Sequence, residues 1–161
     1  MINQNLFIVE DNPLMAEGLR NFLEKKFGSE LHISTFDNGE NVLKAINSDT
    51  TIVLLDYDLK GERADQLLKA IKVINPKTEV IILSSNEDIG VAIDTFRKGA
   101  NQFVVKGKNA QETISYQIFK IITFPAQYLV KEFGVNKFLA YFLLTFASVG
   151  IVVFIGMKIL K

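Results

Sequence analysis

The sequence contains no cysteine, and histidine occurs only once, as His32. Without cysteine the chain has no disulfide, no thiolate metal site and no cysteine nucleophile. A single histidine excludes a cluster of histidine metal ligands and argues against a Ser-His-Asp triad. The N-terminal residues show neither a basic region nor a long apolar run, so we expect no signal peptide and a cytosolic body.

Charge is balanced over the 161 residues, with 18 basic and 18 acidic side chains. This balance hides a difference between two parts of the chain. Residues 1–124 carry 14 basic and 17 acidic side chains, whereas residues 125–161 carry four lysines and one glutamate. The mean hydropathy of +0.21 is high for a soluble domain, so one part of the chain must be unusually apolar.

That apolar part is the segment 138–157, which has 20 residues without a charge, between Lys137 and Lys158. A helix of about 20 residues spans roughly 30 Å, the thickness of the hydrocarbon core of a bilayer. Twelve of these residues are Leu, Ile, Val or Phe, which favour insertion. We therefore expect a single transmembrane helix over 138–157. A helix buried in a soluble core is the alternative, and it would need apolar partners on every side.

Upstream of residue 125, short apolar runs alternate with segments of helical periodicity. Continuous runs of β-branched and apolar residues are typical of strands that are covered on both faces. Five strand–helix units with short connections predict an α/β fold with a doubly wound parallel sheet. The predicted strands cover 6–9, 31–36, 51–55, 80–83 and 102–105, and the predicted helices cover 13–27, 40–46, 64–74, 89–98 and 110–124.

Polar side chains follow four of the predicted strands. Glu10 and Asp11 follow the first, Asp56 the third, Ser84 the fourth and Lys106 the fifth. The carboxyl ends of parallel strands meet at one edge of the sheet, and the strand order 2-1-3-4-5 would bring these groups together. Clustered carboxylates with no histidine or cysteine favour Mg²⁺. The arrangement suits transfer of a phosphoryl group to Asp56, with the Ser84 hydroxyl and Lys106 binding its oxygens.

Residues 3–124 resemble the receiver domain of bacterial two-component response regulators. The resemblance is carried by FIVEDNPLMAEGLRNFL at 7–23, IVLLDYDLKG at 52–61, VIILSS at 80–85 and RKGANQFVVKG at 97–107. It implies the flavodoxin-like five-stranded parallel sheet of order 2-1-3-4-5. The sequence differs from the usual family pattern at Gly107, where proline is common, and at Lys60, Ala64 and Ser85.

The resemblance also implies roles for individual residues. Asp56 is the expected phosphoacceptor, Ser84 the switch hydroxyl and Lys106 the cation that binds the phosphoryl group. Phe103 is at the position of the switch aromatic. The expected Mg²⁺ site consists of the acids Glu10, Asp11 and Asp56 and the backbone carbonyl of Asp58. Asp58 and Asn86 are at positions that tune the lifetime of the aspartyl phosphate, and the sequence gives no direction for that effect.

The sequence therefore predicts a membrane-tethered, single-domain response regulator that accepts a phosphoryl group from a histidine kinase or phosphotransfer protein. It would signal through protein contacts to an unknown downstream protein, which could be membrane-bound, and a homodimer is left open. We expect no nucleic-acid binding and no enzyme activity beyond its own phosphorylation and dephosphorylation. The alternative is a pseudo-receiver, an unphosphorylated scaffold or assembly subunit of a membrane complex.

The expected organisation has four parts, with the receiver domain at 1–124 in the cytoplasm. Residues 125–137 form either a linker that packs on the domain or an interfacial helix. The segment 138–157 would cross the inner membrane once, and 158–161 would form a short tail.

Overall fold

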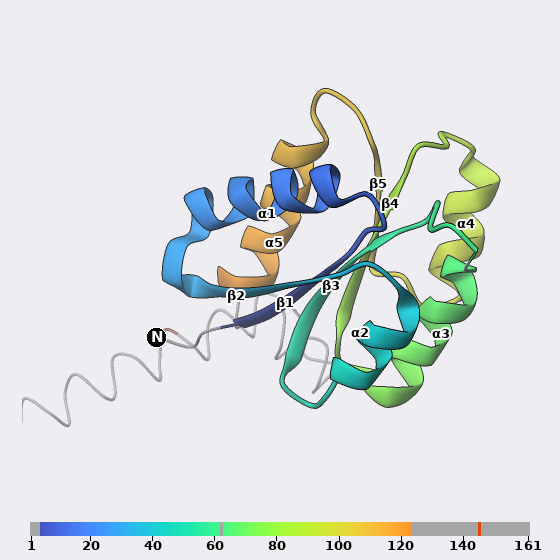
Figure 1. The fold of residues 1–161 in the computed structure, drawn as a ribbon, viewed down its shortest axis with the longest axis horizontal. Coiled ribbons are helices and arrows are strands. Elements are labelled where there is room, and N and C mark those ends of the chain that lie inside the picture. Colours follow the sequence, from blue (N-terminus) through green and yellow to red (C-terminus); the bar gives the residue numbers. More distant parts are fainter. Residues whose placement is uncertain (1–3, 62, 124–144, 146–161) are drawn as a thin grey trace, which may run out of the picture. The chain divides into compact units, whose positions relative to one another are not determined.

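The computed structural model describes residues 4–61, 63–123 and 145, and the chain divides into two compact units, Met1–Phe119 and Lys120–Lys161. Within the first unit, strands and helices alternate as the sequence predicts (Figure 1). The strands are β1 Gln4–Val9, β2 Leu31–Phe36, β3 Thr50–Asp56, β4 Glu79–Ser84 and β5 Gln102–Val105. The helices are α1 Pro13–Phe27, the short 3₁₀ helix η1 Gly28–Glu30, α2 Gly39–Ala45, α3 Ala64–Ile74, α4 Ile89–Arg97 and α5 Ala110–Thr123.

The five strands form one parallel sheet of order β2-β1-β3-β4-β5. This confirms the predicted fold class and strand order. Figure 1 shows α1 and α5 on one face of the sheet and α2, α3 and α4 on the other. Right-handed crossovers between parallel strands produce this two-sided cover when the strand order reverses between β1 and β3.

The strands are apolar on both faces because both faces are covered. Along β3, for example, residues 52 to 55 are all fully buried, and alternate side chains point to opposite faces. Val53 and Leu55 pack with Val42, Leu68 and other residues of α2 and α3. Strands buried on both sides read as continuous apolar runs, which is why the sequence located them within one or two residues.

Local capping explains where the helices begin. The Asn12 side chain accepts hydrogen bonds from the backbone N–H groups of Leu14 and Met15, and Pro13 occupies the first helical position of α1. Asp88 caps α4 in the same way, through the N–H of Gly90. These caps fix the directions in which the chain leaves β1 and β4, next to the predicted site.

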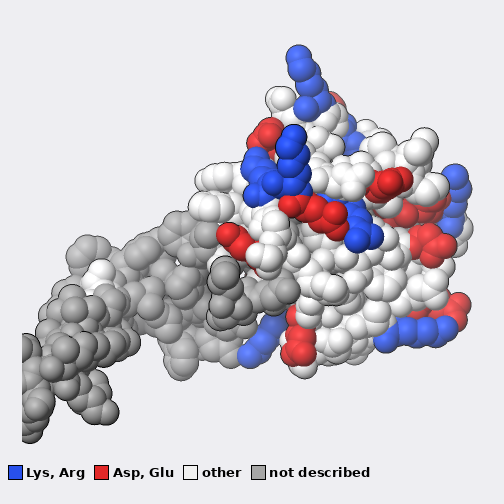
Figure 2. Space-filling view, turned by 60° about the vertical axis from the view of Figure 1, so that its left-hand side comes forward, with Lys and Arg blue, Asp and Glu red and all other residues white. Residues whose placement is uncertain are grey.

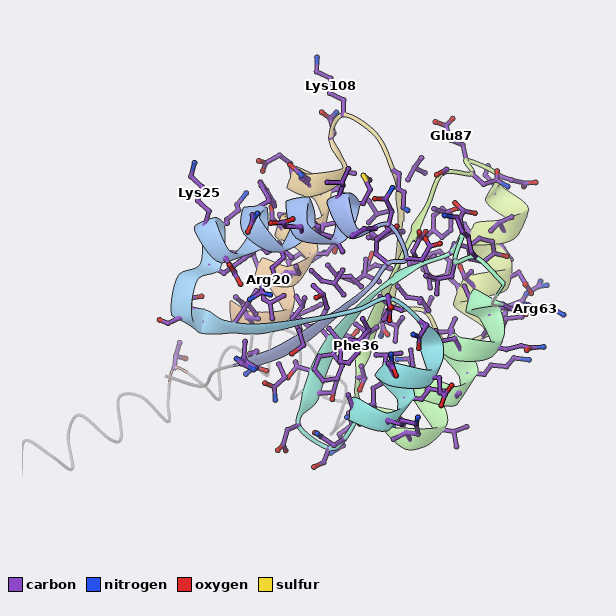
Figure 3. All side chains as sticks on the ribbon, viewed as in Figure 1. Arg20, Lys25, Phe36, Arg63, Glu87 and Lys108 are labelled. Atoms are coloured by element: carbon purple, nitrogen blue, oxygen red, sulfur yellow. The ribbon has the colours of Figure 1, made fainter. Side chains whose placement is uncertain are left out.

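Away from the predicted site, most charged side chains lie on the outside of the first unit. The labelled Lys25, Arg63, Glu87 and Lys108 all point away from the sheet in Figure 3. Basic and acidic groups are intermixed on the face shown in Figure 2, without a continuous patch of one sign. His32 is exposed on β2.

Among the described residues, none of the helices is sufficiently long and apolar to cross a membrane. The predicted span 138–157 lies outside those residues except for Thr145, and the predicted linker 125–137 lies wholly outside them. Both therefore stay predictions.

Candidate functional site

The polar residues that the sequence singled out meet at the carboxyl edge of the sheet. Glu10 and Asp11 follow β1, Asp56 ends β3, and Ser84 ends β4. The first residue after β5, Lys106, is held beside β4 because its backbone N–H donates to the Ser84 carbonyl over 2.8 Å. Parallel pairing of β1 with β3 and of β3 with β4 makes these strand ends neighbours. Glu10, Asp56 and Ser84 are buried, at 6%, 2% and 0% exposure.

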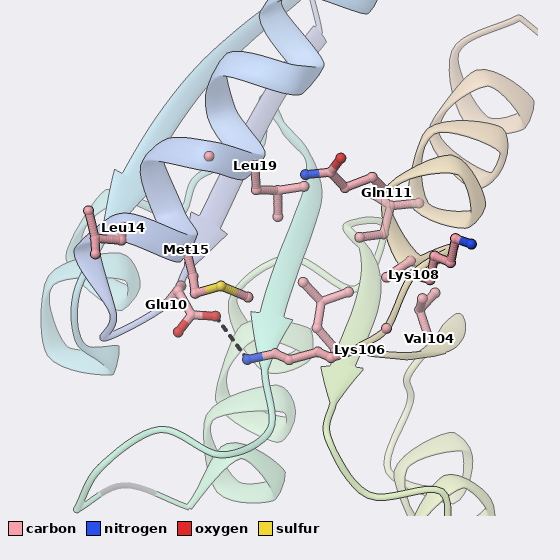
Figure 4. A pocket seen from close by; sticks show the side chains of 13 residues that line it. Glu10, Leu14, Met15, Leu19, Val104, Lys106, Lys108 and Gln111 are labelled. Atoms are coloured by element: carbon pink, nitrogen blue, oxygen red, sulfur yellow. Dashed lines mark hydrogen bonds and ion pairs between the residues drawn. The ribbon is translucent and has the colours of Figure 1, made fainter.

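Lys106 connects two of the acids. Its Nζ lies 2.7 Å from Asp56 Oδ2 and donates to Glu10 Oε2 over 3.0 Å, a contact visible in Figure 4. Burial by itself would lower the pKa of Lys106, but its hydrogen bonds to Asp56 and Glu10 outweigh that effect and raise the pKa. The lysine is therefore charged at neutral pH and compensates part of the negative charge at this edge.

Three carboxylates form a cluster with the geometry of a metal site. One oxygen from each of Glu10, Asp11 and Asp56 lies within 4.8 Å of the others. Burial raises the pKa of the Glu10 carboxyl; the hydrogen bond from Lys106 opposes this rise, and the charge of Asp56 adds to it. Hard oxygen ligands with no nitrogen or sulfur donor among them fit Mg²⁺. Lys60 also approaches this cluster, with its Nζ 3.6 Å from Asp11 Oδ2.

Asp58 bridges two connections at this edge. Its backbone N–H donates to Asp56 Oδ1 over 3.0 Å, and its side-chain Oδ2 accepts from the backbone N–H of Ser85 over 3.1 Å. Next to this contact, the buried Ser84 hydroxyl accepts from the N–H of Asn86 over 3.0 Å. One residue of the β3–α3 connection thus contacts both Asp56 and the start of the β4–α4 connection.

A cavity of about 320 Å³ opens beside Lys106, between α1 and the β5–α5 connection (Figure 4). Glu10 and Lys106 line its polar part, and Met15, Leu19 and Ile114 contribute to its apolar wall. Phe103, at the position expected for a switch aromatic, lies on β5, where its half-buried ring packs against the apolar core beneath α2 and α3. Phe103 thus lies outside the acidic cluster, within β5 rather than at the carboxyl edge of the sheet.

The chain matches the response regulator receiver domain family over residues 6–117. It belongs to that family. The match includes every residue singled out above, from Glu10 to Lys106. The matched residues lie within the first unit, and the match includes no residue of the second.

The curated relatives are longer proteins, and the match covers only a part of each. The chain is 32% identical over 112 residues to the DNA-binding transcriptional regulator NtrC of Escherichia coli K12. The aligned residues make up 68% of this chain but 23% of NtrC. It is 29% identical over 109 residues to the nitrate/nitrite response regulator protein NarP of the same organism, covering 66% of the chain and 49% of NarP. The chain thus spans about a quarter of NtrC and half of NarP.

Solved structures confirm the receiver fold. The signal receiver domain of a putative Luxo repressor protein from Vibrio parahaemolyticus superposes with a TM-score of 0.69 at 18% identity, covering 83% of this chain and 98% of that one. The response regulator TrrA of Thermotoga maritima, solved in complex with Mg²⁺ and BeF, superposes with a TM-score of 0.63 at 23% identity. That match covers 73% of this chain and 98% of the TrrA chain.

Sequence reasoning located the cluster of acids and the nearby lysine but missed two side-chain contacts. The ion pair of Lys60 with Asp11 and the hydrogen bond from Ser85 to Asp58 depend on how the loops fold over the sheet edge. Apolar periodicity carries no information on such contacts. The carbonyl of Asp58 stays a prediction as a metal ligand.

Proposed function

We propose that this receiver domain accepts a phosphoryl group on Asp56 from the phosphohistidine of a kinase or phosphotransfer protein. The observation that carries the proposal is the position of Asp56, whose carboxylate is next to Glu10 and Asp11 on one side and contacts Lys106 on the other. A buried carboxylate with a cation 2.7 Å from one oxygen is held in a fixed position rather than solvated, and such positioning favours a reaction at its oxygens. The relatives NtrC and NarP are regulators by name, which supports a role in signalling.

In the proposed reaction an oxygen of Asp56 attacks phosphorus, the P–N bond of the phosphohistidine breaks, and its electron pair returns to the imidazole. Asp58 N–H and Lys106 Nζ hold the two oxygens of Asp56 and orient the carboxylate. Lys106 and the Ser84 hydroxyl then bind oxygens of the transferred group, so positioning and charge compensation supply the catalysis. The domain performs its own phosphorylation and is not otherwise an enzyme.

Glu10, Asp11, Asp56 and the carbonyl of Asp58 are the residues that would hold Mg²⁺, as the all-oxygen donor set favours. The bound cation would offset the negative charge that the acids and the phosphoryl group bring together. TrrA, a structural neighbour of this fold, was solved with Mg²⁺ and BeF, which supports this choice of cation.

We also propose that residues 138–157 anchor the protein in the inner membrane, with the receiver domain in the cytoplasm. The support is the charge-free apolar sequence of 20 residues. Lys131 and Lys137 on its N-terminal side favour the cytoplasmic face, whereas Lys158 and Lys161 oppose this orientation. Confinement to the membrane would raise the effective concentration of the domain beside a membrane-bound kinase or output protein.

The test is uptake of phosphoryl from acetyl phosphate by the full chain in detergent, followed by intact mass. We expect uptake with Mg²⁺, none with a chelator and none in Asp56→Asn. Lys106→Ala should lower the rate by at least about tenfold because it removes the cation at the acceptor, while the exposed Lys25→Ala should match wild type. Uptake without Mg²⁺ or in Asp56→Asn would contradict the proposal, and a wild-type protein that takes up nothing would favour the pseudo-receiver.

A further inference from the structure

The β4–α4 connection, residues 85–88, is organised by short-range contacts. The Asn86 N–H donates to Ser84 Oγ, the Asp88 N–H donates to Asn86 Oδ1, and Asp88 then caps α4. Each of these contacts joins residues two apart in the chain, so together they shape the connection without fixing it to the rest of the domain.

Asp58 supplies the attachment that these contacts lack. Its Oδ2 accepts from the Ser85 N–H over 3.1 Å, across 27 residues of sequence. Within the part of the chain that the structure describes, it is the only side chain from another element that forms a hydrogen bond with the connection. Because the backbone N–H of Asp58 also contacts Asp56 Oδ1, one residue couples the acceptor to the β4–α4 connection.

From this geometry we infer that Asp58 is a positioning residue that holds the β4–α4 connection in its unphosphorylated conformation, and that phosphorylation of Asp56 weakens this hold. The inference rests on the proposed function of Asp56. Phosphorylation replaces the Asp56 carboxylate, of charge −1, with an acyl phosphate of about −2 charge and three terminal acceptor oxygens next to Asp58. That charge repels the Asp58 carboxylate, and the new oxygens compete for the donor groups beside Ser84, including the Ser85 N–H.

The consequence is a competition between two anions for one backbone donor. Before phosphorylation the Asp58 carboxylate holds the Ser85 N–H, and the connection and α4 stay in the conformation seen here. After phosphorylation the donor is released and the connection is free to shift toward Asp56. A group that stabilises only the unphosphorylated state slows entry into the other state, so removing it should raise the rate of phosphorylation.

The experiment measures two quantities on the full chain in detergent, namely exchange of the Ser85 amide proton by NMR and the acetyl phosphate labelling rate at saturating Mg²⁺. Asp58→Ala removes the acceptor and should speed amide exchange by about tenfold and labelling by about threefold. Asp58→Asn removes the charge but keeps an acceptor oxygen, so both rates should fall between those of wild type and Asp58→Ala. Asp49→Ala, which removes an exposed carboxylate ahead of β3, should match wild type.

Two results would overturn the inference. An unchanged Ser85 exchange rate in Asp58→Ala would show that the hydrogen bond holds nothing. Equal labelling of Asp58→Asn and Asp58→Ala would show that only charge repulsion is involved. If wild type does not label at all, the proposed function fails, while the amide exchange still reports on the hold by Asp58.

Discussion

Lys106 lies between two carboxylates, and its place shows how the site balances charge at the scale of single residues. It is within 3.0 Å of both Glu10 and Asp56, while Lys60 approaches only Asp11, at the longer distance of 3.6 Å. Three acids against one closely bound cation leave the cluster negative. That excess favours a divalent cation over an anion at the cluster, and in the proposed function Lys106 is the group that meets the incoming phosphoryl oxygens.

A second ionic cluster joins α3 to α4 and gives a pH prediction. Asp65 accepts from Lys98 and from Arg63, each over 3.1 Å, and Lys98 also pairs with Asp94. Burial by itself would raise the pKa of Asp65, but the hydrogen bonds from Lys98 and Arg63 outweigh it and lower the pKa below its ordinary value of 3.8. A carboxyl whose pKa is lowered on folding stabilises the fold above its unfolded pKa, and this stabilisation is lost as pH falls through the folded pKa.

Asp65→Asn should therefore unfold at lower urea concentration than wild type at pH 7. The difference should shrink as pH falls below about 4, because the carboxyl of the unfolded chain takes up its proton there and the folded carboxyl follows at lower pH. Urea unfolding curves of the full chain in detergent at pH 7, 5 and 3 measure it, with Glu17→Gln on the exposed face of α1 as the charge control. A difference that stays constant over this range would show that Asp65 acts through packing rather than charge.

At the scale of elements, two glycines should respond to alanine with opposite signs. Gly99 follows α4 with φ +107°, and a Cβ there would lie 3.3 Å from Cγ of Lys72. Gly18 lies inside α1, where a Cβ would meet nothing within 4 Å. Gly99→Ala should cost about 1–2 kcal/mol of stability, whereas Gly18→Ala should add about 0.5–1 kcal/mol.

Thermal or urea unfolding of the two variants and wild type measures this contrast. Because both changes add the same methyl group, each variant is the control for the other. If both variants shifted the unfolding midpoint in the same direction, either the positive φ at Gly99 or the open space at Gly18 would be contradicted.

The sequence predicted the elements well because each strand is buried on two faces and each helix on one. The predicted strand 80–83 became Glu79–Ser84, and the predicted helix 64–74 became Ala64–Ile74 without change. It did not predict Asn75, a buried amide whose Nδ2 donates to the carbonyls of Asn47 and Thr50. Turn residues usually lie at the surface, and nothing in the local pattern distinguishes the one that closes a buried network.

The site was predictable where its residues directly follow strands, but not where its contacts join two loops. Residues directly after strands, such as Glu10, Asp56 and Lys106, are placed by the sheet itself, so their meeting follows from strand order. The contact of Asp58 with Ser85 joins two loops, and loop conformation is set by contacts that form only once the sheet is built. Side-chain pairing between connections is therefore the part of the site that required the structure.

At the scale of the whole molecule, the proposed anchor predicts how the protein fractionates. Full-length protein should stay with membranes after alkaline carbonate extraction, and a chain lacking residues 125–161 should be released. The double variant Val149→Arg with Val152→Arg should also be released, since each arginine near the bilayer centre costs about 2.5–3.5 kcal/mol. Protease added to intact spheroplasts should leave the receiver domain uncut.

Release of the full-length protein by carbonate would refute the anchor, and digestion of the receiver domain from outside the cell would refute its orientation. The matched control is Val149→Leu with Val152→Leu, which changes the same two positions without charge and should remain in the membrane. Phosphoryl uptake should be the same with and without residues 125–161, because the acceptor and its partners all lie between Glu10 and Lys106.

The central claim is that Asp56 is the residue that receives the phosphoryl group, and peptide mass mapping tests it most directly. The full chain is incubated with Mg²⁺ and acetyl phosphate, digested at low temperature and analysed for the modified residue. The account predicts modification of Asp56 alone, lost when Mg²⁺ is chelated. Modification at any other residue, or at Asp56 with Mg²⁺ removed, would contradict the assignment of this site.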